Sequence, residues 1–152
     1  TPLYSSAASD VYKRQTSDGE HQEGNTWEAY MWLGKNPLPN LTIIIDRNYI
    51  QIDGITEDVM PLEPLRQKLE AFGLHVLEVD GHNIRAFVDA VRQAQSEWKR
   101  TSVIIAYTIP GKGVSFMEKK FEWHGKPPNK EEAKKALEEL RTLGGKIISE
   151  HQ

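Results

Sequence analysis

The chain has 152 residues, a formal net charge of −3 and no cysteine, with 38% hydrophobic and 27% charged residues. This composition is typical of a globular domain with a hydrophobic core, and it excludes disulfides, thiolate metal sites and a broad basic surface for nucleic acid. No apolar run approaches the roughly 20 residues that span a bilayer, so we expect no membrane partner and a cytoplasmic location.

The amino-terminal part contains the first predicted elements. Residues 1–17 are small and polar and then basic, without a clear period, and we expect a disordered or non-native leader. A Gly- and acid-rich turn follows, and apolar residues at helical spacing within the stretch 25–35 then predict a helix that stops at Gly34. The nearly continuous apolar run at 41–46 predicts a strand that is covered on both faces.

The rest of the chain alternates helices with strands. Periodicity predicts helices over 62–73, 82–98 and 130–141, and apolar runs predict strands over 74–80 and 101–108. The residues expected to face the core are Ile84, Phe87, Val88 and Val91 in the second of these helices, and Ala133, Ala136, Leu137 and Leu140 in the last. Asn129 and Glu132 form a capping box at the start of the last helix. The segment 109–129 is a long loop whose bulky apolar residues argue against disorder.

The alternation of strands and helices predicts an α/β fold, a three-layer sandwich with a parallel sheet flanked by helices. Three predicted strands are few, because a typical sheet has about five to six. We therefore expect residues 18–152 to form an incomplete domain or one that a partner chain completes.

Three polar segments follow strand ends or, for the first, occupy the equivalent place just before a helix, which is where ligands bind in open α/β sheets. These segments are "SDGE" at 17–20, "DRN" at 46–48 and "TIPGKG" at 108–113. Asp18 and Asn48 offer oxygen ligands that suit Mg²⁺, and Gly19 before a helix would let a phosphate approach the backbone. Asp-Gly and Asn-containing turns are common, however, so spacing alone favours two unrelated turns.

Longer motifs point to a known family. The stretch "DGEHQEGNTWEA…LTIIIDRNYIQIDG" and the motifs "EVDGHN" at 78–83, "KGVSFME" at 112–118 and "WHG" at 123–125 resemble the transketolase family and its thiamine diphosphate motif. The resemblance covers roughly residues 18 to 150. It implies an incomplete thiamine diphosphate-binding fold and the transfer of a two-carbon ketol unit between sugar phosphates. The chain departs from the motif at Ser17, where the family has glycine.

The resemblance also implies roles for single residues. Asp18, Asn48 and the carbonyl of Ile50 would bind the divalent metal, which is Mg²⁺ or else Ca²⁺ or Mn²⁺. The implied cofactor-binding set is Asp18, Gly19, Glu20, Asp46, Asn48, Ile50, Ile52, Ile109 and His124. His124 would position substrate or move protons, and Glu23 would join an acidic network across a dimer interface, so these two are the implied catalytic residues.

Several of these residues have a simpler interpretation. Glu23 is also a typical first-turn acid of a helix, and His124 is also a typical exposed loop histidine. Ile52 and Ile109 would equally suit a hydrophobic core. We expect no site role for the other histidines, which are His21, His75, His82 and His151.

The resemblance implies that this chain lacks parts of the family's active site. The family's pyrimidine-binding domain is missing, so the partner would be such a domain or subunit, in a homodimer or heterotetramer. The chain would be the amino-terminal subunit of a split transketolase, truncated at its start and ending naturally with "GGKIISEHQ", in carbohydrate metabolism such as the pentose phosphate pathway. The alternatives are a deoxyxylulose phosphate synthase, a dehydrogenase E1 subunit, or a non-catalytic α/β fragment or interaction module.

Overall fold

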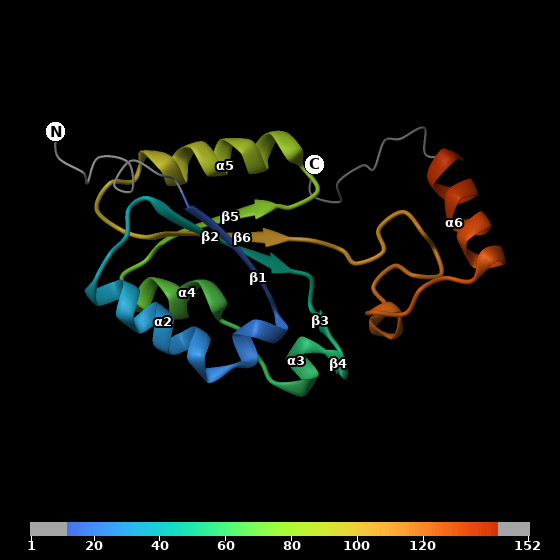
Figure 1. Cartoon of the computed structure of the whole chain (residues 1–152), viewed down its shortest axis with the longest axis horizontal. Coiled ribbons are helices and arrows are strands. Elements are labelled where there is room, and N and C mark those ends of the chain that lie inside the picture. Colours follow the sequence, from blue (N-terminus) through green and yellow to red (C-terminus); the bar gives the residue numbers. More distant parts are fainter. Residues whose placement is uncertain (1–11, 143–152) are drawn as a thin grey trace, which may run out of the picture.

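A parallel sheet forms the central layer of the computed structural model, which describes residues 12–142. The strands lie in the order β1 (Tyr12–Ser17), β2 (Leu41–Arg47), β6 (Ser102–Tyr107) and β5 (His75–Asp80), as Figure 1 shows. All three pairings are parallel. The predicted strands at 41–46, 74–80 and 101–108 are confirmed to within one residue at each end.

Strand β1 differs from the expected leader. All of residues 12–17 pair with β2, with Tyr12 opposite Leu41 and Ser17 opposite Asp46. The expectation of disorder is therefore wrong for 12–17, whereas residues 1–11 lie outside the described residues. That the segment is non-native stays a prediction. As an edge strand with exposed Lys13, Arg14 and Gln15, β1 has neither an apolar run nor a clear alternation.

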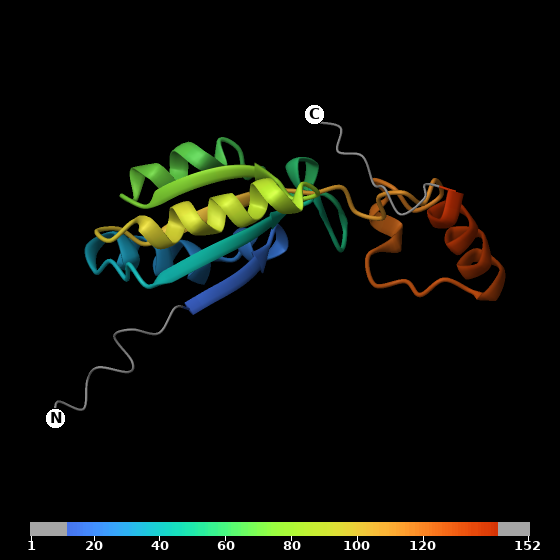
Figure 2. The same ribbon diagram turned by 90° about the horizontal axis from the view of Figure 1, so that it is seen from above.

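Helices cover both faces of the sheet, which confirms the three-layer α/β fold (Figures 1 and 2). On one face α2 (Gly24–Lys35) and α4 (Leu65–Ala71) pack through Leu33, Leu65 and Leu69 against the strands. On the other face α5 (Ile84–Ser96) packs against β5 and β6. The strand β6 lies between these two cores, and its residues 102–106 are all buried.

The buried side of α5 differs from the prediction. Phe87 and Val91 do pack against the second core, but Ile84 is 79% exposed and Val88 is also exposed. The fully packed positions are instead Ala90 and Ala94. Small side chains let the helix approach the sheet closely, so the larger residues are displaced to the flank of the contact.

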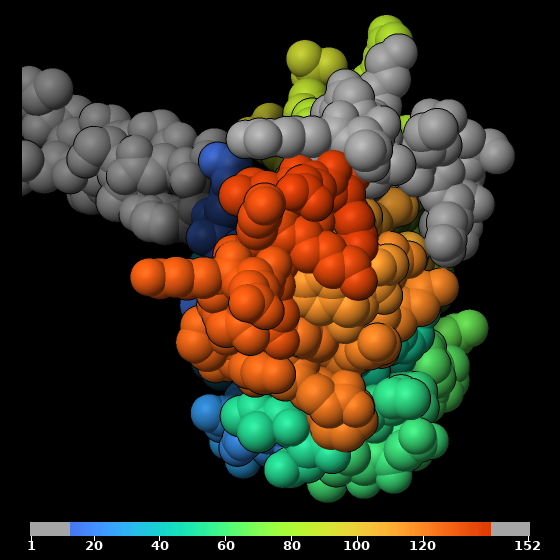
Figure 3. All heavy atoms as spheres, turned by 90° about the vertical axis from the view of Figure 1, so that its right-hand side faces the viewer, coloured from blue at the N-terminus to red at the C-terminus, as the bar shows by residue number. Residues whose placement is uncertain are grey.

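Short elements, a long loop and a last helix lie beyond the strand ends. The short elements are η1 (Gly19–Gln22), the hairpin β3 (Ile50–Gln51) and β4 (Gly54–Ile55), and α3 (Thr56–Val59). The long loop after β6 contains η2 (Phe121–Trp123) and leads to the helix α6 (Lys130–Thr142). The loop and α6 cover this end of the molecule next to the hairpin (Figure 3). The capping box is confirmed, because Asn129 and Glu132 exchange hydrogen bonds of 2.8 and 2.9 Å. Leu137 is exposed, against expectation, whereas Ala136 is buried.

The predicted end of the chain and the expected absence of a membrane-spanning helix are the remaining expectations. The carboxyl-terminal stretch from 144 and His151 lie outside the described residues. Among residues 12–142, none of the helices combines the length and the apolar character that crossing a bilayer requires.

A buried histidine ties η1 to α2. The Nδ1 of His21 lies 2.7 Å from the carbonyl of Ser17, and its Nε2 lies 2.6 Å from the hydroxyl of Tyr30. Because a carbonyl only accepts, Nδ1 carries the proton and Tyr30 donates to Nε2. Burial lowers the pKa of His21 below its usual 6.5.

This histidine should make the fold sensitive to acid. The native pKa lies below the unfolded value, so the unfolded chain takes up the proton first and stability falls as the pH drops below about 6.5. We expect the urea midpoint to fall less between pH 7.5 and 5.5 in His21→Gln than in the wild type. His124→Gln, at an exposed histidine, is the matched control and should keep the wild-type pH dependence. An unchanged pH dependence in His21→Gln would contradict the assignment.

Candidate functional site

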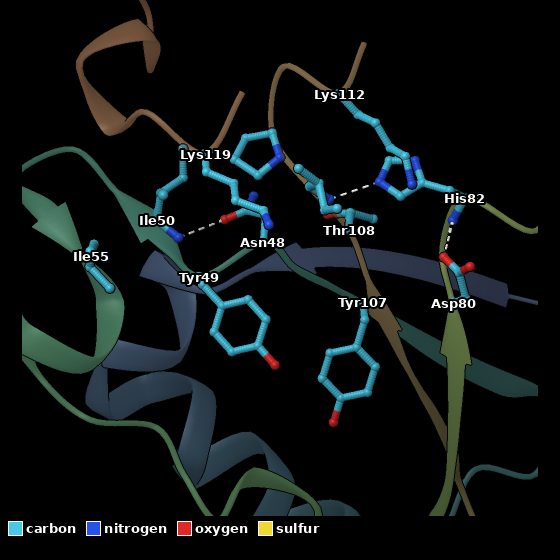
Figure 4. Close-up of a pocket in the computed structure, with 12 residues that line it drawn as sticks. Asn48, Tyr49, Ile50, Ile55, Asp80, His82, Tyr107, Thr108, Lys112 and Lys119 are labelled. Atoms are coloured by element: carbon cyan, nitrogen blue, oxygen red, sulfur yellow. Dashed lines mark hydrogen bonds between the residues drawn. The ribbon is translucent and has the colours of Figure 1, made fainter. Parts of the chain in front are cut away.

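A cavity of about 600 Å³ lies at the carboxyl ends of β2, β5 and β6 (Figure 4). Its wall comes from the turn after β2, the β3–β4 hairpin, the turn after β5 and the loop after β6. The lining residues are Asn48, Tyr49, Ile50, Ile55, Asp80, His82, Tyr107, Thr108, Ile109, Pro110, Lys112 and Lys119. The position agrees with the rule that ligands bind where parallel strands end.

The turn after β5 brings in a histidine for which the sequence predicts no site role. The Nε2 of His82 accepts a hydrogen bond of 2.8 Å from the backbone N–H of Ile109. Burial, followed by the charge of Lys112, lowers the pKa of His82, so the imidazole is neutral near pH 7. His82 therefore links the wall at β5 to the wall at β6. Its position after a strand end was the signal that could have identified it.

An aromatic pair and strained backbone also mark the cavity. The rings of Tyr49 and Tyr107 stack at 6.2 Å, and the Tyr107 hydroxyl donates to Glu78 over 2.6 Å. Burial raises the pKa of Tyr107. Tyr49 and Lys119 have φ angles of 64° and 59°, which are unfavourable for residues with a side chain. Such strain collects at functional sites, and both residues line this cavity.

Asp18 is fully buried beside the cavity wall. Its Oδ2 accepts from the Tyr49 N–H at 2.6 Å, from Arg47 Nη1 at 2.8 Å and from the Thr56 hydroxyl at 3.2 Å. Its Oδ1 is buried and has no partner among the described residues. Burial raises the pKa of Asp18, and the charge of Arg47 opposes this rise.

Arg47 ends strand β2 and is itself fully buried. Besides Asp18, it contacts Glu57 at 2.6 Å and Glu63 at 2.9 Å, and its guanidinium lies 4.0 Å from the centre of the Tyr49 ring. The sequence analysis missed this residue. The available signal was a charged residue at the end of an apolar run. An arginine that is buried at such a position requires carboxylates beside it.

The structure brings some predicted site residues together at the cavity. Asn48, Ile50 and Ile109 line it, and Asn48 Oδ1 accepts from the N–H of Ile50 at 3.1 Å. Asp18 touches the backbone of Tyr49, the residue between the other two predicted metal ligands. Asp46 at the end of β2 accepts a hydrogen bond from the hydroxyl of Thr108, which lines the cavity.

Other predicted residues lie off the cavity wall. Glu20 turns back to β1, where it pairs with Arg14 at 2.9 Å and accepts from the Ser17 N–H at 3.1 Å. Ile52 is 75% exposed, and Glu23 and His124 are also exposed. A Cβ at Gly19 would lie 3.9 Å from the Gln51 Cβ, an ordinary contact. The roles of these residues stay predictions.

The donor atoms near the cavity fit a hard divalent cation. Oδ1 of Asp18 is a buried oxygen without a partner among the described residues, and Asn48 and Ile50 add amide and carbonyl oxygens nearby. Oxygen donors of this kind suit Mg²⁺. Within residues 12–142 no group of three or more His, Cys, Asp or Glu could hold a metal. A cation here would therefore bind through one carboxylate and uncharged oxygens, together with ligand or water oxygens.

Comparisons with known proteins identify a family model and relatives that match this chain. The family model described as transketolase, thiamine diphosphate binding domain, matches residues 6–144. One subunit of the apulose-4-phosphate transketolase of Actinobacillus succinogenes is 44% identical over 126 residues, which are 83% of this chain and 45% of that protein. One subunit of the 6-deoxy-6-sulfo-D-fructose transketolase of Clostridium sp. is 45% identical over 84% of this chain and 46% of its own length.

A solved structure gives the same fold. The transketolase of Campylobacter jejuni superposes with a TM-score of 0.79 and 31% identity, over 93% of this chain and 22% of that one. The chain thus spans about half the length of the curated relatives it matches and about a fifth of this larger enzyme.

Proposed function

Because the chain belongs to the transketolase family and matches its thiamine diphosphate-binding domain, we propose that it forms the diphosphate side of an active site for ketol transfer. The reaction moves a two-carbon ketol unit from a ketose phosphate to an aldose phosphate. One observation carries the proposal: Asn48, Ile50 and Ile109 share one cavity, and the buried Asp18 carboxylate accepts a hydrogen bond from the backbone of Tyr49 in its wall. The sugars named for the relatives differ, so the proposal commits to ketol transfer and not to one pathway.

Asp18, Asn48 and the carbonyl of Ile50 would hold the divalent cation, which we propose to be Mg²⁺. The cation would neutralise a diphosphate at the strand ends, where Lys112 and Lys119 add positive charge to the wall. Gly19 at the start of η1 would offer its N–H to the same anion. The support for this assignment is the chemistry of the oxygen donors and the buried Oδ1 of Asp18, which accepts no hydrogen bond from the described residues.

Thiamine diphosphate, when bound, would supply the nucleophilic chemistry of ketol transfer. The chain's own part is to bind and orient. Ile109 and Ile50 would provide an apolar wall for the ring, and Asp46 would hold the Thr108 turn in place. We also propose Ile52 and Glu20 as cofactor contacts, although neither lines the cavity. His124 would position substrate or move a proton at the sugar.

A partner would have to complete this site. Exposed apolar side chains surround the hairpin beside the cavity, at Ile52, Ile55, Val59 and Met60. Such a patch suits a protein interface, and several relatives are named as single subunits of a transketolase. We propose that a pyrimidine-binding subunit covers it, in a cytoplasmic homodimer or heterotetramer, with Glu23 at the contact between diphosphate domains.

Calorimetry with thiamine diphosphate and Mg²⁺ tests the proposed function. The wild-type chain should bind the pair, and Asn48→Ala should bind it more weakly by at least the roughly 10- to 100-fold typical of changes around a metal site. Asn36→Ala is the matched control, because Asn36 is an exposed asparagine at the end of α2. Equal binding in both variants would contradict the proposal, and no binding by the wild type would favour a fragment without activity of its own or a non-catalytic module.

A further inference from the structure

We infer that Arg47 is a positioning residue that holds the Asp18 carboxylate so that one of its oxygens stays available to a divalent cation. The inference rests on the proposed function, since it assigns a task to a residue beside the proposed cation ligands. Arg47 does not line the cavity, and its side chain has no oxygen that could bind a cation.

The first observation is that the two carboxylate oxygens of Asp18 differ in their hydrogen bonds. Oδ2 receives three donors, from Arg47, the Tyr49 N–H and Thr56, whereas Oδ1 receives none from the described residues. A buried carboxylate oxygen without a donor costs free energy unless it gains a partner. The contacts therefore saturate one oxygen and leave the other for a ligand.

The anchoring of Arg47 is the second observation. Its guanidinium donates to Glu57 and Glu63 on the side away from Asp18, at 2.6 and 2.9 Å. Both carboxylates are fixed in turn, because Glu57 accepts from the Leu62 N–H at 3.1 Å and Glu63 from the Leu65 N–H at 2.9 Å. Arg47 thus joins β2, α3 and the start of α4, and it cannot turn without breaking contacts in all of them.

Charge is the third observation. An arginine beside a cation site would ordinarily repel a divalent ion. Here Asp18, Glu57 and Glu63 surround one guanidinium, so the group carries a formal charge of −2 when the acids are ionised. The two glutamates balance Arg47 and leave the cluster attractive to a dication. The planar fork of arginine, which lysine lacks, is needed to contact all three acids at once.

Mn²⁺ titration of the full chain, followed by electron paramagnetic resonance at saturating thiamine diphosphate, tests this inference. Arg47→Met should weaken Mn²⁺ binding by about 10- to 100-fold, as is typical when an outer-shell partner is removed, and Arg47→Lys should fall in between. In an Asp18→Ala background, Arg47→Lys should change the remaining Mn²⁺ affinity by less than about twofold. Measurements are made well below the unfolding midpoint of each variant, so that lower stability alone does not change the affinity.

Controls separate this inference from the proposed function. Arg66→Met removes an arginine with two carboxylate partners, Glu70 and Glu78, and should bind Mn²⁺ like the wild type. If Arg47→Met does not fold, Thr56→Val takes its place, because it removes another donor to Asp18 Oδ2 and should also weaken binding. Wild-type affinity in the folded Arg47 or Thr56 variants overturns the inference while the function stands. Absence of Mn²⁺ binding in the wild type overturns both.

Discussion

Replacing Asp18 with alanine should lower the free energy of unfolding by about 3–5 kcal/mol and strongly weaken Mg²⁺-dependent binding of thiamine diphosphate. The loss of stability is expected because Arg47 would keep its burial but lose the partner on one side. The N–H of Tyr49 and the hydroxyl of Thr56 would also lose their acceptor. Urea denaturation measures the first effect and calorimetry the second.

Two further variants separate the structural effect from the loss of a ligand. Asp18→Asn keeps the shape of the side chain and an oxygen that can face the Tyr49 N–H, so it should fold but bind the cation weakly. Asp58→Ala, at an exposed aspartate on the nearby helix α3, should leave both measurements unchanged. Wild-type stability in Asp18→Ala would show that the buried ion pair contributes little. Wild-type binding in a folded Asp18→Ala would remove Asp18 from the proposed cation site.

The strand-end rule pointed to Asn48 and to the loop after β6, but not to the contacts that support them. Asp18 follows β1, which pairs with β2 but was not predicted as a strand. Arg47 has no such signature, because its partner Glu57 lies 10 positions away in the short helix α3 and its partner Glu63 lies 16 positions away, just before α4. Pairing across such separations depends on the tertiary fold, which periodicity does not describe.

Edge elements and close contacts limited the prediction of the fold in the same way. The strands at 41–46 and 101–108 are buried on both faces, so an apolar run identified them. Strand β1 lies at the edge and has exposed polar residues, so its membership follows only from pairing with β2. In α5 the buried face contains Ala90 and Ala94. Close packing of the helix on the sheet requires small side chains there, so hydrophobicity alone does not identify the buried residues.

Gly34 shows what a close contact requires. The sequence predicted that the helix stops there, but α2 continues to Lys35. A Cβ at position 34 would lie 2.0 Å from the carbonyl oxygen of Phe72, which follows α4. Because that atom belongs to the backbone, a side chain can be fitted only if the two helices move apart. The glycine is therefore explained by packing between α2 and α4, not by the end of a helix.

Gly34→Ala should consequently lower the free energy of unfolding by about 3 kcal/mol, the upper end for overpacking. Urea denaturation of the two variants Gly34→Ala and Gly24→Ala provides the test. Gly24 begins the same helix and a Cβ there meets nothing within 4 Å, so its replacement should be neutral or slightly stabilising through helix propensity. A stable Gly34→Ala would mean that α4 can shift without cost. Glycine would then have no steric reason at this position. It would only be the poorer choice there, since alanine favours the helix interior by up to about 1 kcal/mol.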